Sequence, residues 1–555
     1  MTRPKIQQFE YELADNVAFD DKAWQTRQEP IPIVGQELAF VALVQELMAT
    51  RPLDTAAYHR IMRQHARAGV PWLSKYHLLH VYEQLCADGW LTFDPDVPLH
   101  LQMKPVRTQA GVTVVTVLTK PYACPGKCIF CPTDVRMPKS YLHDEPGAQR
   151  AERYAFDPYD QTAGRISALE KIGHPVEKIE LLILGGTWSS YPRAYQEWFV
   201  HRCFEAMNGQ ESPDLATAQQ VNSTAVRRNV GLVVETRQDH ITPDELRWMR
   251  YLGVTKVQVG IQSMDERVLA LNMRGHDGQA TRDAFRLLRL GGFKIHGHWM
   301  PNLLGATPAS DMADYASLWD DPAIRPDELK IYPCMLLENA ELYAYWQRGE
   351  YQPYTEEEVL NVLVECKAIT PRYARLTRVV RDIPTTNVVA GFTKANLRQL
   401  AQKRLKEEGR PCQCIRCREV RRTEITAAEM RLRVEEYATV GTMEYFLGME
   451  TAEGKLAGFL RLSLPDPNQE LPLPELANHA MIREVHVYGP ALPLGEESQG
   501  EAQHMGLGMW LIGEAKRRAR EAGYGRVAVI SAIGTQQYYA KHGFVVDGLY
   551  MTCPL

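Results

Sequence analysis

The pattern of hydrophobic and polar positions changes character twice along the chain. In residues 1 to about 95, apolar side chains recur every three or four positions, which is the spacing of an amphipathic helix. This spacing predicts helices at Glu37–Ala49, Ala56–Ala68 and Lys75–Gly89. We therefore expect a small helical region, rich in loops, at the beginning of the chain.

From Val112 to about Pro371, short apolar runs alternate with helical stretches. The strand-like runs are Val112–Thr119, Ile179–Leu184, Gly231–Glu235, Lys256–Gln262, Phe293–Met300 and Leu329–Leu336. The helical stretches between them are Glu152–Lys171, Tyr195–Met207, Pro243–Tyr251, Gln279–Leu290 and Ala309–Trp319. This alternation predicts an α/β fold, a TIM-like parallel barrel of six βα units that lacks the last two. The chemistry of such barrels lies at the C-terminal ends of the strands.

A mixed α/β pattern fills the end of the chain, after a basic block from Arg372 to about Thr423. Its strand-like runs are Glu444–Met449, Leu456–Ser463, Met481–Tyr488 and Val527–Ser531. A helical run that ends at Gly523 lies between the last two. We therefore expect four parts, at residues 1–95, 96–371, 372–423 and 424–555.

Composition fits a chain of several soluble domains. At 555 residues the chain is too long for one hydrophobic core, and 45% apolar with 24% charged residues is ordinary for globular protein. No run of eighteen apolar residues predicts a membrane span, and the first residues have no apolar segment typical of a secretion signal. Most of the eleven cysteines lie in close clusters or near strand ends, which suits metal ligands in the reducing cytoplasm.

Positive charge is concentrated locally, although the net charge is −5. Between Arg372 and Arg422 there are fourteen Lys or Arg residues against four Asp or Glu residues. This block is either a phosphate-binding face or a solvated helix surface. Basic and aromatic residues also alternate near the second predicted helix: Arg51, Arg60, Arg63, Arg67, Trp72, Lys75 and Tyr76. Such a mixture suits RNA bases that stack on rings, or else belongs to an ordinary helical domain.

The richest motif is Cys124-Pro-Gly-Lys-Cys128-Ile-Phe-Cys131, directly after the first predicted strand. Three thiolates at this spacing can hold three irons of a four-iron, four-sulfur cluster and leave the fourth iron open, as in radical S-adenosylmethionine (SAM) enzymes. The alternative is a zinc loop. A closed zinc site needs a fourth ligand nearby, and the nearest histidine is His143, twelve residues on.

Polar residues end the next three predicted strands, where the cluster loop also lies. Gly185, Gly186 and Thr187 follow the second strand, and glycines there let the backbone approach the methionine part of SAM closely. Glu235 ends the third strand and Gln262 ends the fourth. Together these residues predict a SAM site in register with the cysteine loop.

The segment Gln503-His504-Met505-Gly506-Leu507-Gly508 begins a helix after an apolar strand. This is the Q/R-x-x-G-x-G pattern of acetyl-CoA-binding N-acetyltransferase-like (GNAT) domains, in which backbone N–H groups at the helix start receive a pyrophosphate. The preceding strand could pair with pantetheine through the backbone of Glu484, Val485, His486 and Val487. Tyr538 and Tyr539 are candidates to face the thioester, and we expect at least one of them in the core.

Cys412, Cys414 and Cys417 supply three soft ligands within six residues, which predicts zinc. Tetrahedral zinc needs a fourth ligand. Cys334, at the end of the sixth predicted strand, is the best candidate, and a buried apolar thiol is the alternative for it.

A radical SAM barrel followed by a GNAT domain resembles the family of Elongator catalytic subunits, in its stand-alone bacterial or archaeal form. The resemblance covers nearly the whole chain. It depends on the cysteine loop and on nine further motifs that stand in order: 104–111, 184–187, 234–237, 272–276, 329–333, 381–384, 483–489, 503–508 and 538–539. The CxCxxC cysteines are absent from many eukaryotic relatives, so the resemblance implies a structural zinc between barrel and GNAT domain.

The resemblance implies that the protein makes 5-carboxymethyluridine at the wobble position in the anticodon stem-loop of tRNA. A SAM-derived radical would take hydrogen from the methyl group of acetyl-CoA, the carbon radical would add to C5 of uracil, and thioester hydrolysis would release CoA. An electron donor must reduce the cluster. Lys178 stands where the family has a basic residue that holds acetyl-CoA, and a solvated lysine is its alternative. The basic block and the basic N-terminal helices become the expected tRNA surface.

Two other functions remain open from the residues alone. One is a protein lysine acetyltransferase with a structural iron-sulfur cluster, in which Glu484 would accept the proton. The other is a tRNA-binding scaffold in which the cluster is inert. The oligomeric state, monomer or homodimer, is also open.

Overall fold

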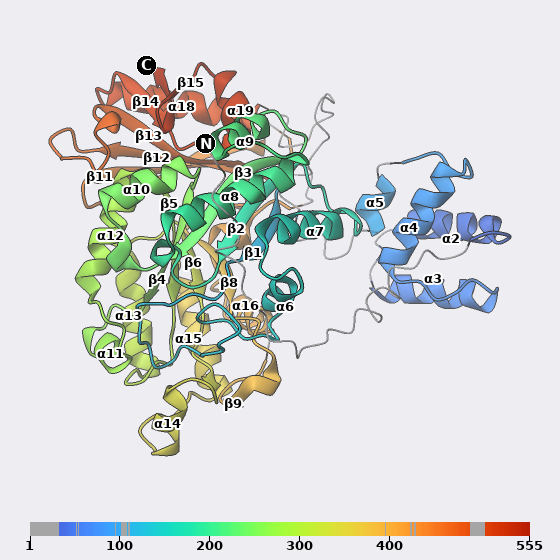
Figure 1. Cartoon of the computed structure of the whole chain (residues 1–555), viewed down its shortest axis with the longest axis horizontal. Helices are drawn as coiled ribbons and strands as arrows, with labels where there is room; N and C mark the ends of the chain where they lie inside the picture. Colours follow the sequence, from blue (N-terminus) through green and yellow to red (C-terminus); the bar gives the residue numbers. More distant parts are fainter. Residues whose placement is uncertain are drawn as a thin grey trace.

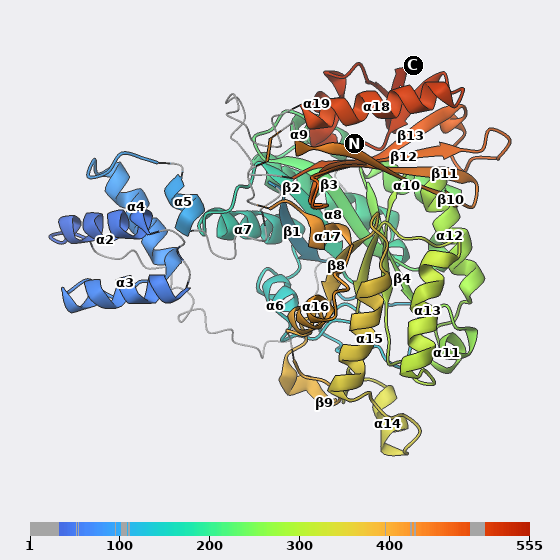
Figure 2. The ribbon, with the colours of Figure 1, turned by 180° about the vertical axis from the view of Figure 1, so that it is seen from behind.

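The computed structural model describes residues 33–50, 53, 55–94, 96–101, 108, 111–394, 396–421, 425–426, 429–488 and 506–555. Within this part of the chain, no helix is both long enough and apolar enough to cross a bilayer. The described residues form a helical N-terminal region, a barrel-like parallel sheet wrapped by helices, and a second sheet at one end of that barrel (Figures 1 and 2).

Within its described residues, the N-terminal region contains the helices α2 (Glu37–Ala49), α3 (Thr55–Arg67), α4 (Lys75–Ala87) and α5 (Asp96–Leu101). The three helices predicted here are confirmed. Phe40, Leu43, Leu78 and Leu85 lie in a core of their own, separate from the main core. Both views place this region to one side of the barrel, nearest α7 (Figures 1 and 2). The helical spacing of apolar residues thus closes into a local core, as the sequence predicts.

All strands of the barrel sheet are parallel, in the order β1-β2-β3-β4-β5-β6-β8. Their bounds are β1 Thr113–Leu118, β2 Lys178–Leu184, β3 Arg228–Thr236, β4 Lys256–Gln262, β5 Lys294–Trp299, β6 Glu328–Ile331 and β8 Arg375–Val379. Six strands coincide with the predicted runs, although the run Leu329–Leu336 divides into β6 and the short β7 (Leu336–Leu337). The partial barrel is therefore confirmed.

The seventh strand, β8, was not predicted, because it lies inside the block that basic residues set apart as a linker. Leu376 and Val379 are buried in this strand, whereas Arg375 is partly buried and Arg378 is exposed. Arg375 and Arg378 pair with Glu419 and Asp382, so their charge is compatible with a place in the sheet. The strand could not be predicted from this basic block, because a local sequence pattern does not show which ion pairs its arginines form in the folded chain.

Helices cover the outer face of the barrel sheet (Figures 1 and 2). They are α6 Pro146–Arg153, α7 Pro158–Glu170, α8 Arg193–Asn208, α9 Leu215–Asn222, α10 Pro243–Tyr251, α11 Glu266–Leu271, α12 Gly278–Leu290, α13 Pro308–Asp320 and α15 Glu356–Ile369. Several begin where the sequence gives a cap: Thr307 and Ser310 form a capping box with Pro308 at the first turn of α13. The caps fix where each helix leaves the loop that follows a strand.

The stretch after β6 adds α14 (Leu342–Gln347), β9 (Val388–Ala390), which pairs with β7, α16 (Leu397–Glu407) and α17 (Ile415–Arg418). Most basic residues of the block from Arg372 to Arg422 are neutralised within the fold. Arg404 pairs with Glu357, Arg410 pairs with Glu365, and Arg418 pairs with Glu450. The block is therefore largely a set of structural ion pairs, and it gives weaker support for a tRNA surface than its charge suggested.

The C-terminal sheet has the strand order β10-β11-β12-β13-β14-β16-β15. Its elements are β10 Arg431–Thr439, β11 Thr442–Glu450, β12 Leu456–Pro465, β13 His479–Val487, α18 Leu507–Glu521, β14 Arg526–Val529, α19 Gln536–Ala540, β15 Val545–Asp547 and β16 Tyr550–Pro554. The four predicted strands are confirmed, and β10, β15 and β16 are additional. Only β13 and β14 pair in parallel, through helix α18.

This sheet packs against the N-terminal ends of the barrel strands. Arg483 of β13 binds the carbonyl of Phe293 just before β5 and the carboxylate of Asp327 just before β6. Arg461 of β12 donates to the carbonyl of Tyr373, just ahead of β8. The cysteine loop lies beyond the opposite, C-terminal ends of the strands, so the two sheets and the loop are stacked along the barrel axis.

Candidate active site

A cavity of about 1130 Å³ runs through the inside of the partial barrel. At one end it is lined by Cys124, Cys128 and Cys131, and at the other by Glu484 and His486 of β13. Every second residue of β4 faces it: Lys256, Gln258, Gly260 and Gln262. A seven-residue strand spans about 20 Å, so the cavity connects two sites roughly that far apart. Barrel interiors are usually filled by branched apolar side chains, and this one is polar and open.

The cysteine loop follows β1, as predicted, and its thiols are half-buried at the cavity wall. The Cys124 sulfur lies 3.5 Å from Oγ1 of Thr187 and 3.4 Å from the Gly126 nitrogen. Among the described residues, the three sulfurs do not form a group whose members all lie within 4.8 Å of one another. A single zinc ion would draw three thiolates closer than that, because each Zn–S bond is about 2.3 Å. The loop therefore fits a multi-iron cluster better than one zinc ion.

Gly185 and Gly186 connect β2 to Thr187 with backbone angles that only glycine adopts easily, φ +145° and +87°. A Cβ on Gly185 would lie 1.7 Å from Oγ1 of Thr119. Gly186 and Thr187 line the cavity beside the cysteine loop. The expected SAM-facing turn is thus beside the cysteines, with exposed backbone rather than side chains.

Glu235 and Gln262 also line the cavity at the cysteine end. Burial raises the pKa of Glu235, whose carboxylate lies 3.5 Å from the hydroxyl of Tyr141 and 3.6 Å from Nδ1 of His298. Gln262 has φ +67°, and its buried Oε1 has no hydrogen-bond partner among the described residues. An unused buried acceptor is costly, so it is an observation that points to a ligand in the cavity.

The opposite end of the cavity holds a chain of alternating charges. Lys256 bridges Glu180 and Glu328 at 2.9 and 3.2 Å, and Lys294 contacts both Glu328 and Glu484. The nearby cations hold the pKa of Glu328 well below its usual range, against the effect of burial. This chain ties the first residues of the barrel strands to β13.

Glu484 is fixed by two cations, Lys294 and Arg461, and the second contact is 2.9 Å. They lower the pKa of Glu484 although the side chain is buried. A general base works best with a pKa near the operating pH. In this setting Glu484 is a poor proton acceptor, which weakens the interpretation of Glu484 as a catalytic base.

Strand β13 offers an open edge at the predicted pantetheine position. Its pairing with β14 extends only from His479 to Ile482, while its other edge pairs with β12 up to Val487. The backbone of Glu484, Val485 and His486 thus has no β14 partner in the described ladder, at the place where the sequence predicts an added strand. His486 is buried between Phe459 and Tyr488, and burial lowers its pKa to about 3.

Helix α18 begins at the predicted glycines. Gly506 adopts φ +70°, and a Cβ on Gly508 would lie 2.2 Å from the hydroxyl of Tyr538. Tyr538 is 40% exposed and lies over this helix start, whereas Tyr539 is buried against Phe544. The expectation that one tyrosine belongs to the core is met by Tyr539. Gln503, His504 and Met505 lie outside the described residues, and Leu507 is a buried first-turn residue.

Lys178 is the first residue of β2, at the end of the strand that is far from the cysteines. Burial and the neighbouring Arg228 lower its pKa. It is not among the described residues that line the cavity, and the 3-10 turn Ile533–Thr535 of the C-terminal part packs nearby on β3. A role toward acetyl-CoA therefore stays a prediction.

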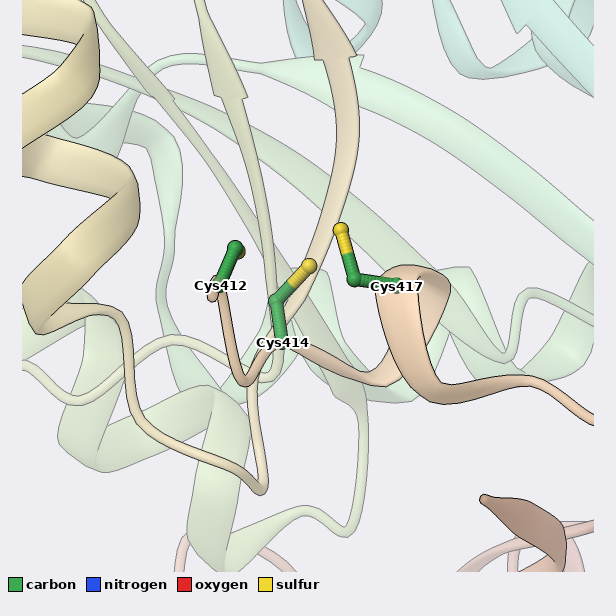
Figure 3. A group of neighbouring side chains, drawn as sticks. All are labelled: Cys412, Cys414 and Cys417. Carbon is green, nitrogen blue, oxygen red and sulfur yellow. The ribbon is translucent and has the colours of Figure 1, made fainter. Parts of the chain in front are cut away.

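Cys412, Cys414 and Cys417 form the one group of described residues whose possible ligand atoms all lie within 4.8 Å of one another. Figure 3 shows the loop before α17 and the start of that helix bringing them together. Nε2 of Gln402 lies 3.3 Å from the Cys417 sulfur, and Nζ of Lys367 lies 3.9 Å from it. Close packing of three thiols fits one zinc ion.

Cys334 does not join this group, so the expectation that it completes the zinc site is wrong for this arrangement. It is buried in another cluster, with Ile129, Leu336 and Tyr351. Burial raises the pKa of its thiol, as expected for an apolar cysteine. The sequence could not show how far Cys334 lies from Cys412, because that distance depends on tertiary packing. The loop that carries Cys412 packs beside Lys367 of α15.

Pattern analysis missed the polar residues inside the barrel: Gln258, His296, His298, Lys330 and Arg274. Nε2 of His298 and Nζ of Lys330 both bind Oε1 of Gln258. Burial lowers the pKa of both histidines well below its ordinary value. Polar residues at every second position of buried strands were a usable signal, because such strands are otherwise continuously apolar.

Two family models match the chain. Residues 119–314 match the Radical SAM superfamily, and residues 326–407 match the Radical_SAM C-terminal domain. The first match contains the cysteine loop and β2 to β5. The second contains β6 and β8, which extends the radical SAM part of the chain past Pro371.

Proteins with similar sequences extend this finding over most of the chain. A tRNA uridine(34) acetyltransferase of Methanocaldococcus jannaschii is 41% identical over 81% of this chain and 86% of its own length. One from Dehalococcoides mccartyi is 40% identical over 80% of this chain and 98% of its own length. Human Elongator complex protein 3 is 35% identical over 81% and 85%. The solved structure of archaeal Methanocaldococcus infernus Elp3 with an N-terminal deletion is 37% identical, covers 80% of this chain and all of its own, and has a TM-score of 0.71.

Proposed function

This chain belongs to the Elongator complex protein 3 family of radical SAM proteins, and we propose that it modifies C5 of the wobble uridine in tRNA, using SAM and acetyl-CoA. The product we propose is the 5-carboxymethyl group. C5 of uracil is too weak a nucleophile for ordinary acyl transfer, so a radical route is needed. Curated relatives are named for action on tRNA uridine 34.

The observation that carries the proposal is the single cavity between the cysteine loop and β13. Two half-reactions that share a carbon fragment need a passage between their sites. The polar inner face of β4 to β6 supplies such a passage over roughly 20 Å. This length is comparable to an extended pantetheine arm, so the acetyl group could enter from the β13 end.

At the cysteine end, Cys124, Cys128 and Cys131 would hold the cluster, and the backbone at Gly186 with Glu235 and Gln262 would hold SAM. A four-iron cluster bound there supplies the electron that cleaves SAM to a 5′-deoxyadenosyl radical. Gln262 offers an unpaired buried Oε1, and Glu235 is flanked by Tyr141 and His298. These side chains would orient SAM and exclude water.

At the β13 end, the backbone of Glu484, Val485 and His486 would pair with pantetheine, and the start of α18 would receive the pyrophosphate. Helix α18 has 15 residues, with Gly506 and Gly508 at its start. Exposed Tyr538 lies over that start, so it is the better of the two tyrosines to face the thioester. Lys178 remains a candidate contact for another part of CoA.

Zinc on Cys412, Cys414 and Cys417 would be structural, because its site lies behind α15 and the three cysteines are not among the residues lining the cavity. The tRNA would approach through the mouth of the barrel. Exposed basic residues of α3, Arg60, Arg63 and Arg67, form a second candidate surface for it. An external electron donor is required.

The test is anaerobic reconstitution of the cluster followed by addition of dithionite, SAM, acetyl-CoA and tRNA, with nucleoside analysis by mass spectrometry. We expect a carboxymethyl increment on wobble uridine that Cys128→Ala and Gly506→Glu each abolish. Cys203→Ala is the matched control, since Cys203 is a buried cysteine remote from the loop. SAM cleavage without modified uridine would refute the proposed substrate, and acetylated lysine without SAM cleavage would favour the acetyltransferase alternative.

A further inference from the structure

Arg274 connects the cysteine loop to the barrel sheet. It lies in the loop between α11 and α12, within the motif Asn272-Met-Arg274-Gly-His276. Its Nη1 lies 3.4 Å from the Cys128 sulfur, and its Nη2 donates to the Gly260 carbonyl of β4 at 2.6 Å. The proposed chemistry leaves this residue without a role.

The guanidinium is held in one orientation. Only 6% of the Arg274 residue is exposed. Gln238 accepts from Nη2 at 3.3 Å, and Gln238 is itself anchored by donating to the Gly260 carbonyl at 2.8 Å. Nε is buried without a hydrogen-bond partner among the described residues, although the side chain lines the cavity. A buried cation held in one orientation thus lies against the Cys128 sulfur.

We propose that Arg274 is a positioning residue that holds the Cys128 ligand and raises the reduction potential of the cluster. The inference depends on the proposed function only in that a cluster occupies the cysteine loop. Adding one electron from an external reductant increases the negative charge shared by the cluster sulfurs. A charge-assisted N–H···S bond stabilises that charge more in the reduced state than in the oxidised state, so reduction becomes easier.

Residues around Arg274 offer a way to move the guanidinium without removing it. A Cβ on Gly260 would lie 2.8 Å from Nη2 of Arg274, so Gly260→Ala displaces the fork and leaves the charge in place. Arg274→Lys keeps the charge but loses the planar fork that reaches both Cys128 and Gly260. Arg274→Gln removes both. The three variants therefore separate the hydrogen bond from the charge.

The experiment measures the midpoint potential of the reconstituted, SAM-free protein by a mediated dithionite titration, followed by electron paramagnetic resonance. Iron and sulfide content are measured on the same samples. We expect Arg274→Gln to lower the reduced-to-oxidised ratio at a fixed solution potential about tenfold, which is 59 mV for a one-electron couple. Gly260→Ala and Arg274→Lys should shift the potential in the same direction by less. Arg282→Gln is the control and should not shift the potential, because Arg282 lies on α12 and pairs with Asp321.

An unchanged potential in Arg274→Gln with full iron content would overturn the inference. If Arg274 instead clamps SAM, the variant would keep its SAM-free potential and bind SAM more weakly, which would overturn it equally. Should Arg274→Gln fail to retain the cluster, Gly260→Ala and Arg274→Lys carry the same comparison. A wild-type protein that binds no four-iron cluster would overturn the proposed function as well, whereas unchanged potentials in an active enzyme would overturn this inference alone.

Discussion

Arg483 and Asp327 lie 156 positions apart in the sequence and form a two-armed ion pair, with both N–O distances 2.7 Å. Arg483 belongs to β13 and Asp327 precedes β6, so the pair joins the C-terminal sheet to the barrel. Both side chains are fully buried. The surrounding arginines lower the pKa of Asp327 well below its usual range, although burial alone would raise it. The pair therefore fixes β13, which carries Glu484 and His486, against the N-terminal end of β6.

Asp327→Asn should destabilise the protein by about 3 kcal/mol, because it leaves Arg483 and Arg461 buried beside a neutral group. The measurement is thermal unfolding followed by circular dichroism. Glu475→Gln is the matched control. It removes another ion pair between the same two units, with Arg247 of α10, but that pair is exposed and worth about 0–1 kcal/mol. Equal losses of stability in the two variants would contradict this role of the Arg483–Asp327 pair.

Cys412→Ser should release zinc, which elemental analysis of the purified protein would show as the loss of about one ion per chain. Three thiolates within 4.8 Å of one another would share that ion, and removing one would leave too few soft ligands. Cys334→Ser should keep its zinc in full, since Cys334 lies in a different cluster. Zinc loss in Cys334→Ser would restore the sequence-based assignment of the fourth ligand.

Leu182→Trp should uncouple the two half-reactions. Leu182 lies in the middle of β2 and faces the cavity, so a larger side chain there narrows the passage between the cysteine loop and β13. We expect SAM cleavage to persist while modified uridine falls at least tenfold. Leu182→Ala enlarges the passage at the same position and should retain the product. Full activity in the tryptophan variant would mean that the acetyl group takes another route.

The exposed face of α3 should bind tRNA phosphates. Arg60, Arg63 and Arg67 lie on this face and have no ion-pair partner among the described residues, and Trp72, in tilted contact with His59, is 53% exposed. Replacing the three arginines with glutamine should weaken binding. The slope of log affinity against log salt concentration should become shallower by about 2. The readout is fluorescence anisotropy of labelled tRNA at several salt concentrations.

The matched control for the tRNA surface replaces Lys394, Arg404 and Arg410 with glutamine. This substitution also removes three positive charges, but each of the three residues is already paired with a glutamate of α15. We expect little change in the salt slope. A larger loss from this set than from the α3 set would return the tRNA surface to the basic block.

Asp311 should make stability fall as pH rises from about 4 to 7. Burial raises its pKa to about 7, whereas an unfolded aspartate titrates near 3.9. Between these values the native state binds a proton that the unfolded state lacks, so stability declines by at most about 1.4 kcal/mol per pH unit and levels off above 7. Asp311→Asn should remove this slope from the melting temperature measured between pH 4 and 8. Parallel pH curves for the two proteins would contradict the assignment.

Local sequence determined most of the helices and strands of this protein. The spacing of apolar residues alone predicted the N-terminal helices, six barrel strands and four strands of the second sheet. Burial places apolar residues at positions that are typical of each kind of element. The spacing of Cys124, Cys128 and Cys131 likewise needed no tertiary information, since the three ligands lie on one loop. The roles of the remaining site residues stay predictions.

Features that depend on contacts between residues far apart in the sequence were decided only by the tertiary structure. Strand β8 lay hidden in a basic block because its arginines are neutralised by partners elsewhere in the chain, such as Glu419. The sequence predicted that Cys334 lies beside the cysteines of the expected zinc site, but Cys334 packs in another cluster. The cavity, the Arg274 contact with Cys128 and the Arg483–Asp327 pair all join elements far apart in sequence. Which polar residues meet across a barrel depends on strand order and register, and no local pattern encodes either.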